Sequence, residues 1–130
     1  MRPGCEGAEE ALVEPSRKNE ERQQALYQAL RREVNERKRL ESATDGILEF
    51  TCECSDAKCR ELVSLTVDEY EFIRQVPNRL VVRIGHVNSS SERVIMEEPG
   101  RFQVLEKFGP GGDVVAHFNP RRRGRLDSRD

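Results

Sequence analysis

Apolar and polar residues alternate from Ile47 to Cys54 with a period of two. One face of this segment carries Leu48, Phe50, Cys52 and Cys54, and the other carries Glu49, Thr51 and Glu53. Such alternation is typical of a strand that is buried on one face. It predicts that Cys52 and Cys54 point inward and that Glu53 points outward.

Further strands are predicted near Glu61–Leu65, Arg79–Ile84, Glu92–Glu97, Phe102–Lys107 and Asp113–Phe118. Turn-forming residues separate several of them, at Asn88–Ser91, Pro99–Gly100 and Gly109–Gly112. We interpret the last of these turns as a hairpin. Because strands this close in sequence connect most simply to their neighbours, we expect one antiparallel meander.

A short helix is predicted to follow the second strand. Thr66 and Glu69 have the spacing of a capping box, and the helix must end before Pro77. Tyr70 and Arg74 are four residues apart, so they share a face of this helix. We interpret Tyr70 as a core residue and Arg74 as the partner of an acidic residue; a shared ligand-binding patch is the alternative.

A longer, charged helix is predicted for residues 16–43, and Thr44–Gly46 ends it. Its apolar stripe is thin and is formed mainly by Leu26, Leu30 and Val34. A coiled coil needs apolar positions repeated over several heptads, so this stripe does not predict one. We expect it to contact a protein partner or a second copy of the chain, rather than the helix's own domain.

These elements predict the α+β class: a small antiparallel sheet with one short helix, preceded by a long charged N-terminal helix. The predicted organisation is a disordered N-terminal tail (1–15), the charged helix (16–43), a small α+β domain (46–119) and a disordered basic tail (120–130).

Composition narrows the function classes. The chain has 130 residues, of which 35% are charged and 35% are hydrophobic, and it has no Trp. A net charge of -2 argues against general binding of nucleic acid or membranes. Neither a signal peptide nor an apolar run of membrane-spanning length is visible, so we expect a cytoplasmic protein in which thiols stay reduced.

Cys52, Cys54 and Cys59 form a C-x-C-x4-C motif at the end of the first predicted strand. The Ser55-Asp56 step is suited to a turn that brings Cys59 back toward the other two thiols. Three convergent thiolates predict a zinc site that needs a fourth ligand. His86 is the best candidate, because it falls on the inward parity of the strand that ends near Ile84.

Weaker candidates for the fourth ligand are Asp56 and His117. The thiols also have other interpretations. They can be inert core residues, or Cys54 and Cys59 can form a reversible disulfide, which would make the protein a thiol-redox sensor or oxidoreductase. We interpret Cys5 as an unpaired bystander in the N-terminal tail.

Catalysis is not the expected role. A zinc ion with four protein ligands is closed and structural, whereas a catalytic zinc keeps a position open for water. Nucleic-acid association through the basic clusters Arg37–Arg39 and Arg121–Arg125 is a further alternative, although such clusters more often form solvated faces. We therefore predict a non-catalytic interaction or regulatory module that zinc stabilises.

The joint pattern is similar to a family of small uncharacterised bacterial proteins with a charged N-terminal helix. The resemblance covers roughly residues 19–120 and departs from the family pattern mildly at Leu80. It rests on Asn35-Glu36-Arg37, Phe50-x-Cys52-Glu53-Cys54-x4-Cys59, Leu65-Thr66-x2-Glu69-Tyr70-x3-Arg74, Gly85-His86, Glu92-Arg93-Val94 and Val104-x-Glu106-Lys107. The family implies no established activity, but its motif positions include the cysteine triplet, Tyr70, Arg74 and His86.

Overall fold

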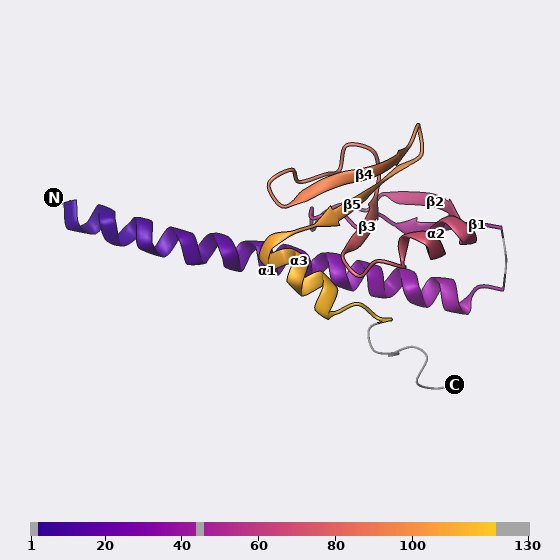
Figure 1. Cartoon of the computed structure of the whole chain (residues 1–130), viewed down its shortest axis with the longest axis horizontal. Coiled ribbons are helices and arrows are strands. Elements are labelled where there is room, and N and C mark those ends of the chain that lie inside the picture. The colour runs from indigo at the N-terminus through magenta and orange to yellow at the C-terminus, as the bar shows by residue number, and fades with distance from the viewer. Residues whose placement is uncertain (1–2, 44–45, 122–130) are drawn as a thin grey trace.

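The computed structural model describes residues 3–43 and 46–121, with side chains from Lys18 onward. The elements in order are α1 (Pro3–Glu41), β1 (Ile47–Thr51), β2 (Leu62–Thr66), α2 (Val67–Ile73), β3 (Arg79–Val82), β4 (Glu92–Glu98), β5 (Phe102–Lys107) and α3 (Gly109–His117). This content confirms the predicted α+β class. The C-terminal half of α1 lies along the sheets, and its N-terminal half extends away from them (Figure 1). Within the described residues, every helix is too short or too polar to cross a membrane.

The strands form two sheets rather than the single meander expected from the sequence. β1 pairs with β2 in an antiparallel hairpin, and β5 lies between β3 and β4 in a second antiparallel sheet. The chain reverses at Gly100, whose φ of 75° favours glycine, and returns β5 along β4. The opposite edge of β5 pairs with β3.

One hydrophobic core joins the two sheets and α2. Its largest side chains are buried completely, and they include Phe50, Leu65, Tyr70, Phe102 and Leu105. The rings of Phe50 and Tyr70 stack with centroids 4.3 Å apart. The capping box that opens α2 is confirmed, because Thr66 accepts the Glu69 N–H and Glu69 accepts the Thr66 N–H.

A contact of the apolar stripe with another chain stays a prediction, but helix α1 itself docks on its own domain, which corrects the expectation that it would not. It does so through small and polar residues, since Ala25, Gln28, Ala29, Arg32, Asn35 and Glu36 are all buried. The apolar stripe of Leu26, Leu30 and Val34 faces outward, with 40 to 63% of each residue exposed. α1 also begins before Ser16, at Pro3, and ends at Glu41. The spacing of apolar residues in the sequence identified this outward stripe. The face of α1 that docks is a different one, and its polar side chains hydrogen-bond to backbone groups of the sheet.

The predicted strand Asp113–Phe118 is wrong, and so is the hairpin at Gly109–Gly112. Both lie in α3, with Pro110 in the first helical turn, where its missing N–H costs nothing. Gly111 approaches Ala25 of α1 closely, and Val115 is buried with Ala25. Packing against α1 therefore overrides the strand preference of the valines.

The predicted tail beginning at residue 120 is also corrected at its start. Pro120 is buried, and Arg121 forms ion pairs with Glu36 of α1 and Glu71 of α2. The rest of that predicted tail, residues 122–130, lies outside the described residues.

Substitution of Gly112 tests the packing of α3. A Cβ on Gly112 would overlap the carbonyl oxygen of Lys107, which is rigid backbone. We expect Gly112→Ala to lower the free energy of unfolding by about 2 kcal/mol, as overpacked sites do. Chemical denaturation measures this change. Asp113→Ala, an exposed position in the same helix, is the control and should change stability by less than about 0.5 kcal/mol.

Candidate metal centre

The predicted ligands come together. One donor atom from each of Cys52, Cys54, Cys59 and His86 lies within 4.8 Å of the others. His86 Nδ1 is 3.5 Å from Cys52 Sγ and 3.7 Å from Cys59 Sγ. A tetrahedral zinc with bonds of about 2.3 Å to sulfur and about 2.0 Å to nitrogen separates such atoms by about 3.6 Å. The donor set and its spacing therefore fit a zinc ion.

Local backbone structure explains how the three cysteines meet. Cys52 continues the hairpin beyond β1, because its N–H donates to the Glu61 carbonyl oxygen. The chain then turns at Asp56, whose carboxylate accepts the Lys58 N–H and whose carbonyl oxygen accepts the Cys59 N–H. This turn returns Cys59 to the other thiols, as its sequence predicted.

His86 reaches the cluster from a turn after β3 rather than from the strand. β3 ends at Val82, and the His86 N–H donates to the Arg83 carbonyl oxygen. Gly85 has a φ of 90°, which permits this reversal. The strand parity that selected His86 was therefore wrong, although the residue lies where it was expected.

Each sulfur also receives a backbone N–H. The Arg83 N–H donates to Cys52 Sγ over 3.3 Å, the Asp56 N–H bonds to Cys54, and the Glu61 N–H bonds to Cys59. Every one of these bonds lowers the pKa of the thiol that receives it, because it stabilises the thiolate. Thiolate is the form of cysteine that binds metals.

The pKa values of the three thiols differ. Hydrogen bonding from Cys52 lowers the pKa of Cys54 to about 4. The same bond and burial raise the pKa of Cys52, and burial raises the pKa of Cys59. Hydrogen bonding within the cluster thus favours one thiolate shared among its sulfurs. A metal ion that binds all three sulfurs displaces the protons of the other two.

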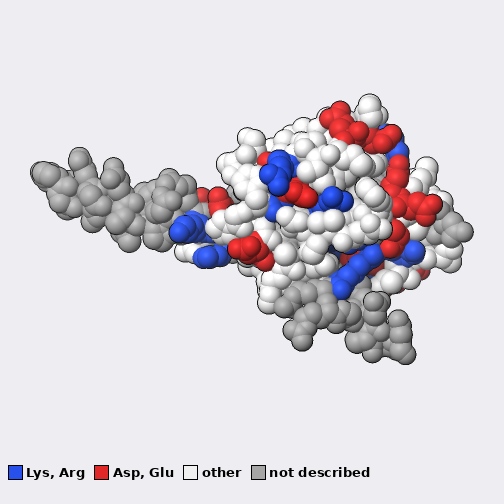
Figure 2. Space-filling model, in the orientation of Figure 1, with Lys and Arg blue, Asp and Glu red and all other residues white. Residues whose placement is uncertain are grey.

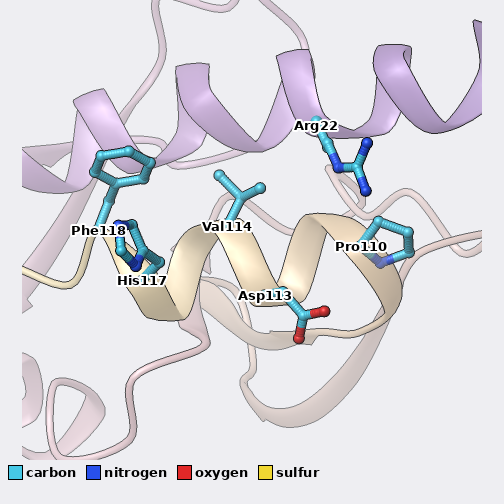
Figure 3. Close-up of a pocket in the computed structure, with 6 residues that line it drawn as sticks. All are labelled: Arg22, Pro110, Asp113, Val114, His117 and Phe118. Atoms are coloured by element: carbon cyan, nitrogen blue, oxygen red, sulfur yellow. The ribbon is translucent and has the colours of Figure 1, made fainter.

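The two weaker ligand candidates are not among the four residues whose donor atoms converge. The Asp56 side chain caps its own turn, and His117 lies at the end of α3 in edge contact with Phe118. Figure 3 shows His117 and Phe118 beside a pocket between α1 and α3, which Arg22 and Pro110 also line. Cys5 lies outside the residues whose side chains are described.

Glu53 is buried completely, which corrects its predicted outward position. Past Cys52 the chain runs between α1 and β3, because the Glu53 N–H donates to the Val81 carbonyl oxygen and the Glu53 carbonyl oxygen accepts from Gln28. The Glu53 carboxylate accepts bonds from Arg74 (2.7 Å), Asn35 (2.7 Å) and the Val81 N–H (3.0 Å). The interpretation of Arg74 as the partner of an acidic residue is confirmed.

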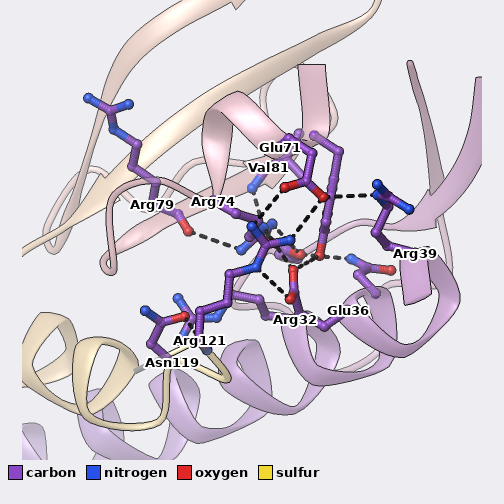
Figure 4. Close-up of polar contacts among 12 residues, drawn as sticks. Arg32, Glu36, Arg39, Glu71, Arg74, Arg79, Val81, Asn119 and Arg121 are labelled. Atoms are coloured by element: carbon purple, nitrogen blue, oxygen red, sulfur yellow. Dashed lines mark hydrogen bonds and ion pairs between the residues drawn. The ribbon is translucent and has the colours of Figure 1, made fainter. Parts of the chain in front are cut away.

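The carboxylate of Glu53 belongs to a buried polar network that the sequence did not reveal. The Glu36 carboxylate accepts the Tyr70 hydroxyl (2.6 Å) and Arg121 (2.8 Å), and Arg121 and Arg39 both pair with Glu71 (Figure 4). Burial raises the pKa of Tyr70 and keeps its hydroxyl protonated. Tyr70 and Arg74 are thus interior contacts of the domain.

A second buried pair lies at the other end of the interface. Lys107 and Glu92 are both buried and 2.9 Å apart, and Gln28 of α1 donates to the same carboxylate over 2.8 Å. Ser91 accepts from Lys107. The alternation of charges along β4 and β5 gave no signal that these two charges face inward.

Comparison of the chain with protein-family models, curated proteins and solved structures gives no match. The functional argument therefore depends on the geometry of this chain. The similarity to small uncharacterised bacterial proteins stays a prediction.

Removal of the Glu53 charge tests the buried network. Glu53→Gln removes the nearer of the two carboxylates that pair with the buried Arg74 guanidinium and leaves only Glu36, at 3.9 Å; breaking a buried pair on one side costs about 3 kcal/mol. Equilibrium denaturation should show this loss. The control is Glu61→Gln, whose ion pair with Arg83 is exposed and is worth less than about 1 kcal/mol. If Glu53→Gln and Glu61→Gln lower the free energy of unfolding equally, the buried network does not stabilise the domain as described.

Proposed function

We propose that this protein is a non-catalytic cytoplasmic interaction or regulatory module whose domain is stabilised by a structural zinc ion bound to Cys52, Cys54, Cys59 and His86. The observation that carries the proposal is the convergence of four donors, three of them sulfurs that each receive a backbone N–H. Four protein ligands close the coordination sphere, so they favour a structural role over catalysis.

The redox alternative, through Cys54 and Cys59, is less well supported. A dithiol needs only two sulfurs, whereas here Cys52 and His86 complete a four-donor set. His86 Nδ1 lies near two of the three sulfurs, as a fourth ligand would. The small core also favours a structural metal, because a domain of this size gains stability from one.

The contacts of the described basic residues disfavour nucleic-acid binding, whereas Arg122, Arg123 and Arg125 lie outside the described residues. Arg39 and Arg121 are both paired with Glu71, and Lys38 donates to the Glu49 carbonyl oxygen. Figure 2 shows Lys and Arg side chains beside Asp and Glu side chains on the face in view. Mixed signs do not form the continuous basic surface that phosphate binding needs.

Metal content is the direct test of the proposal. Protein purified without a chelator or a polyhistidine tag should contain about one zinc per chain by elemental mass spectrometry. His86→Ala should weaken zinc binding at least about tenfold, because loss of a ligand costs at least as much as loss of an outer contact. His117→Ala is the control and should retain wild-type affinity. Protein with no metal and four titratable thiols, Cys5 included, would contradict the proposal and favour the redox alternative.

Self-association through α1 is the second part of the proposal. The outward stripe carries Leu26, Leu30 and Val34 at helical spacing, which suits a second copy of the chain. We expect the wild-type protein to sediment as more than one chain and Leu30→Glu to sediment as a single chain. Phe72→Glu, at an exposed apolar position on α2, is the control and should leave assembly unchanged. A monomeric wild type would contradict self-association.

A further inference from the structure

Four polar side chains of α1 contact the backbone of the segment that carries the cysteines. Gln28, Arg31, Asn35 and Lys38 are three or four residues apart, so they form one stripe along the helix. Lys38 donates to the Glu49 carbonyl oxygen (2.5 Å), Asn35 to that of Thr51 (2.9 Å) and Gln28 to that of Glu53 (3.1 Å). We call these four residues the polar stripe.

The polar stripe takes the place of a third strand beside β1. The N–H and carbonyl groups of alternate residues in a strand point to opposite edges. Cys52 donates to Glu61 on the β2 side, whereas Glu49, Thr51 and Glu53 present their carbonyl oxygens to α1. Asn35 also accepts the Thr51 N–H over 2.8 Å. The free edge of β1 is therefore satisfied by side chains of a helix.

Arg31 extends this arrangement to the cysteine loop itself. Its guanidinium donates to the carbonyl oxygens of Cys54 (2.9 Å), Ala57 (3.0 Å) and Cys59 (3.2 Å). These three oxygens converge on one guanidinium only when the loop has turned back at Asp56. That same turn brings Cys59 to the other ligands. The conformation that Arg31 binds is thus the conformation that assembles the donor set.

The charge of Arg31 also suits the centre. Three thiolates and a neutral histidine around a divalent zinc leave a net charge of about -1. The Arg31 guanidinium lies 3.7 Å from Cys54 Sγ, close enough to offset that charge. It is the one member of the polar stripe with a contact to a ligand sulfur among the described residues.

We propose that Arg31 is an outer-shell residue of the metal centre, and that metal binding and the docking of α1 are coupled through it. The inference rests on the proposed function, because it requires the four ligands to bind zinc. Metal loss frees the loop, removes the three carbonyl contacts of Arg31 and loosens the polar stripe. Coupling of this kind is reciprocal, so loss of Arg31 weakens zinc binding by the same factor by which zinc strengthens its contacts.

Zinc affinity of three variants tests the role of Arg31. Competition with a chromophoric chelator should show zinc binding about tenfold weaker in Arg31→Gln, the usual cost of losing an outer-shell contact. Arg37→Gln removes the same charge from the exposed face of the same helix, and it should keep an affinity within about twofold of wild type. Equal affinities of the two variants would overturn the proposal.

A third variant separates charge from geometry. Arg31→Lys keeps the positive charge but loses the fork that reaches three carbonyl oxygens. Its affinity should fall between those of the wild type and Arg31→Gln. If Arg31→Lys binds zinc as tightly as the wild type, the positive charge alone accounts for the effect of Arg31 on zinc affinity. That result would contradict coupling through the loop conformation.

Hydrogen exchange tests the effect on α1. Removal of zinc should speed amide exchange in residues 28–38, while β5 in the core remains protected as the internal reference. Equal loss of protection in both regions would contradict specific coupling to α1. The two proposals fail differently: a wild type that binds no zinc would refute the metal centre, whereas zinc binding without a change in α1 or in Arg31→Gln would refute only the coupling.

Discussion

The burial of one carboxylate constrains much of this structure. Glu53 is fully buried between two cysteines of the motif, so its charge must be satisfied by other elements. Arg74 after α2, Asn35 of α1 and the backbone of β3 all bond to it. A single side chain thereby fixes α1, α2 and β3 around the strand that enters the cysteine loop.

A polar interface is an unusual way to attach a long helix to a small domain. Among the described side chains, the docked face of α1 contributes Ala25 and Ala29 to the apolar packing, and α3 meets it through Gly111 and Val115. Hydrogen bonds to strand carbonyls and buried ion pairs supply the remaining contacts. Such contacts are directional, so they specify one position of the helix more strongly than an apolar stripe would.

The proposed metal centre and the polar interface share the same stretch of backbone. The sulfurs of Cys52 and Cys54 lie on one side of this stretch, while the Glu53 side chain and the carbonyl oxygens beside it accept hydrogen bonds from side chains of α1. The C-x-C spacing suits this position, because alternate residues of an extended chain point to opposite sides. The two cysteines can therefore face the cluster while the residue between them faces α1. Arg31 lies where these two sets of contacts meet.

Local pattern by itself determined the strands up to β5, the capping box of α2 and the C-x-C-x4-C turn. These follow from periodicity and turn chemistry, which act between residues close in sequence. Only the tertiary structure decided the burial of Glu53, the docked face of α1 and the helical state of residues 109–117. The physical reason is that their partners are distant: Glu53 pairs with Arg74 across 21 positions, and Glu36 with Arg121 across 85. A pattern shows which side chains share a face, but the partner that covers the face decides whether a charge on it is buried.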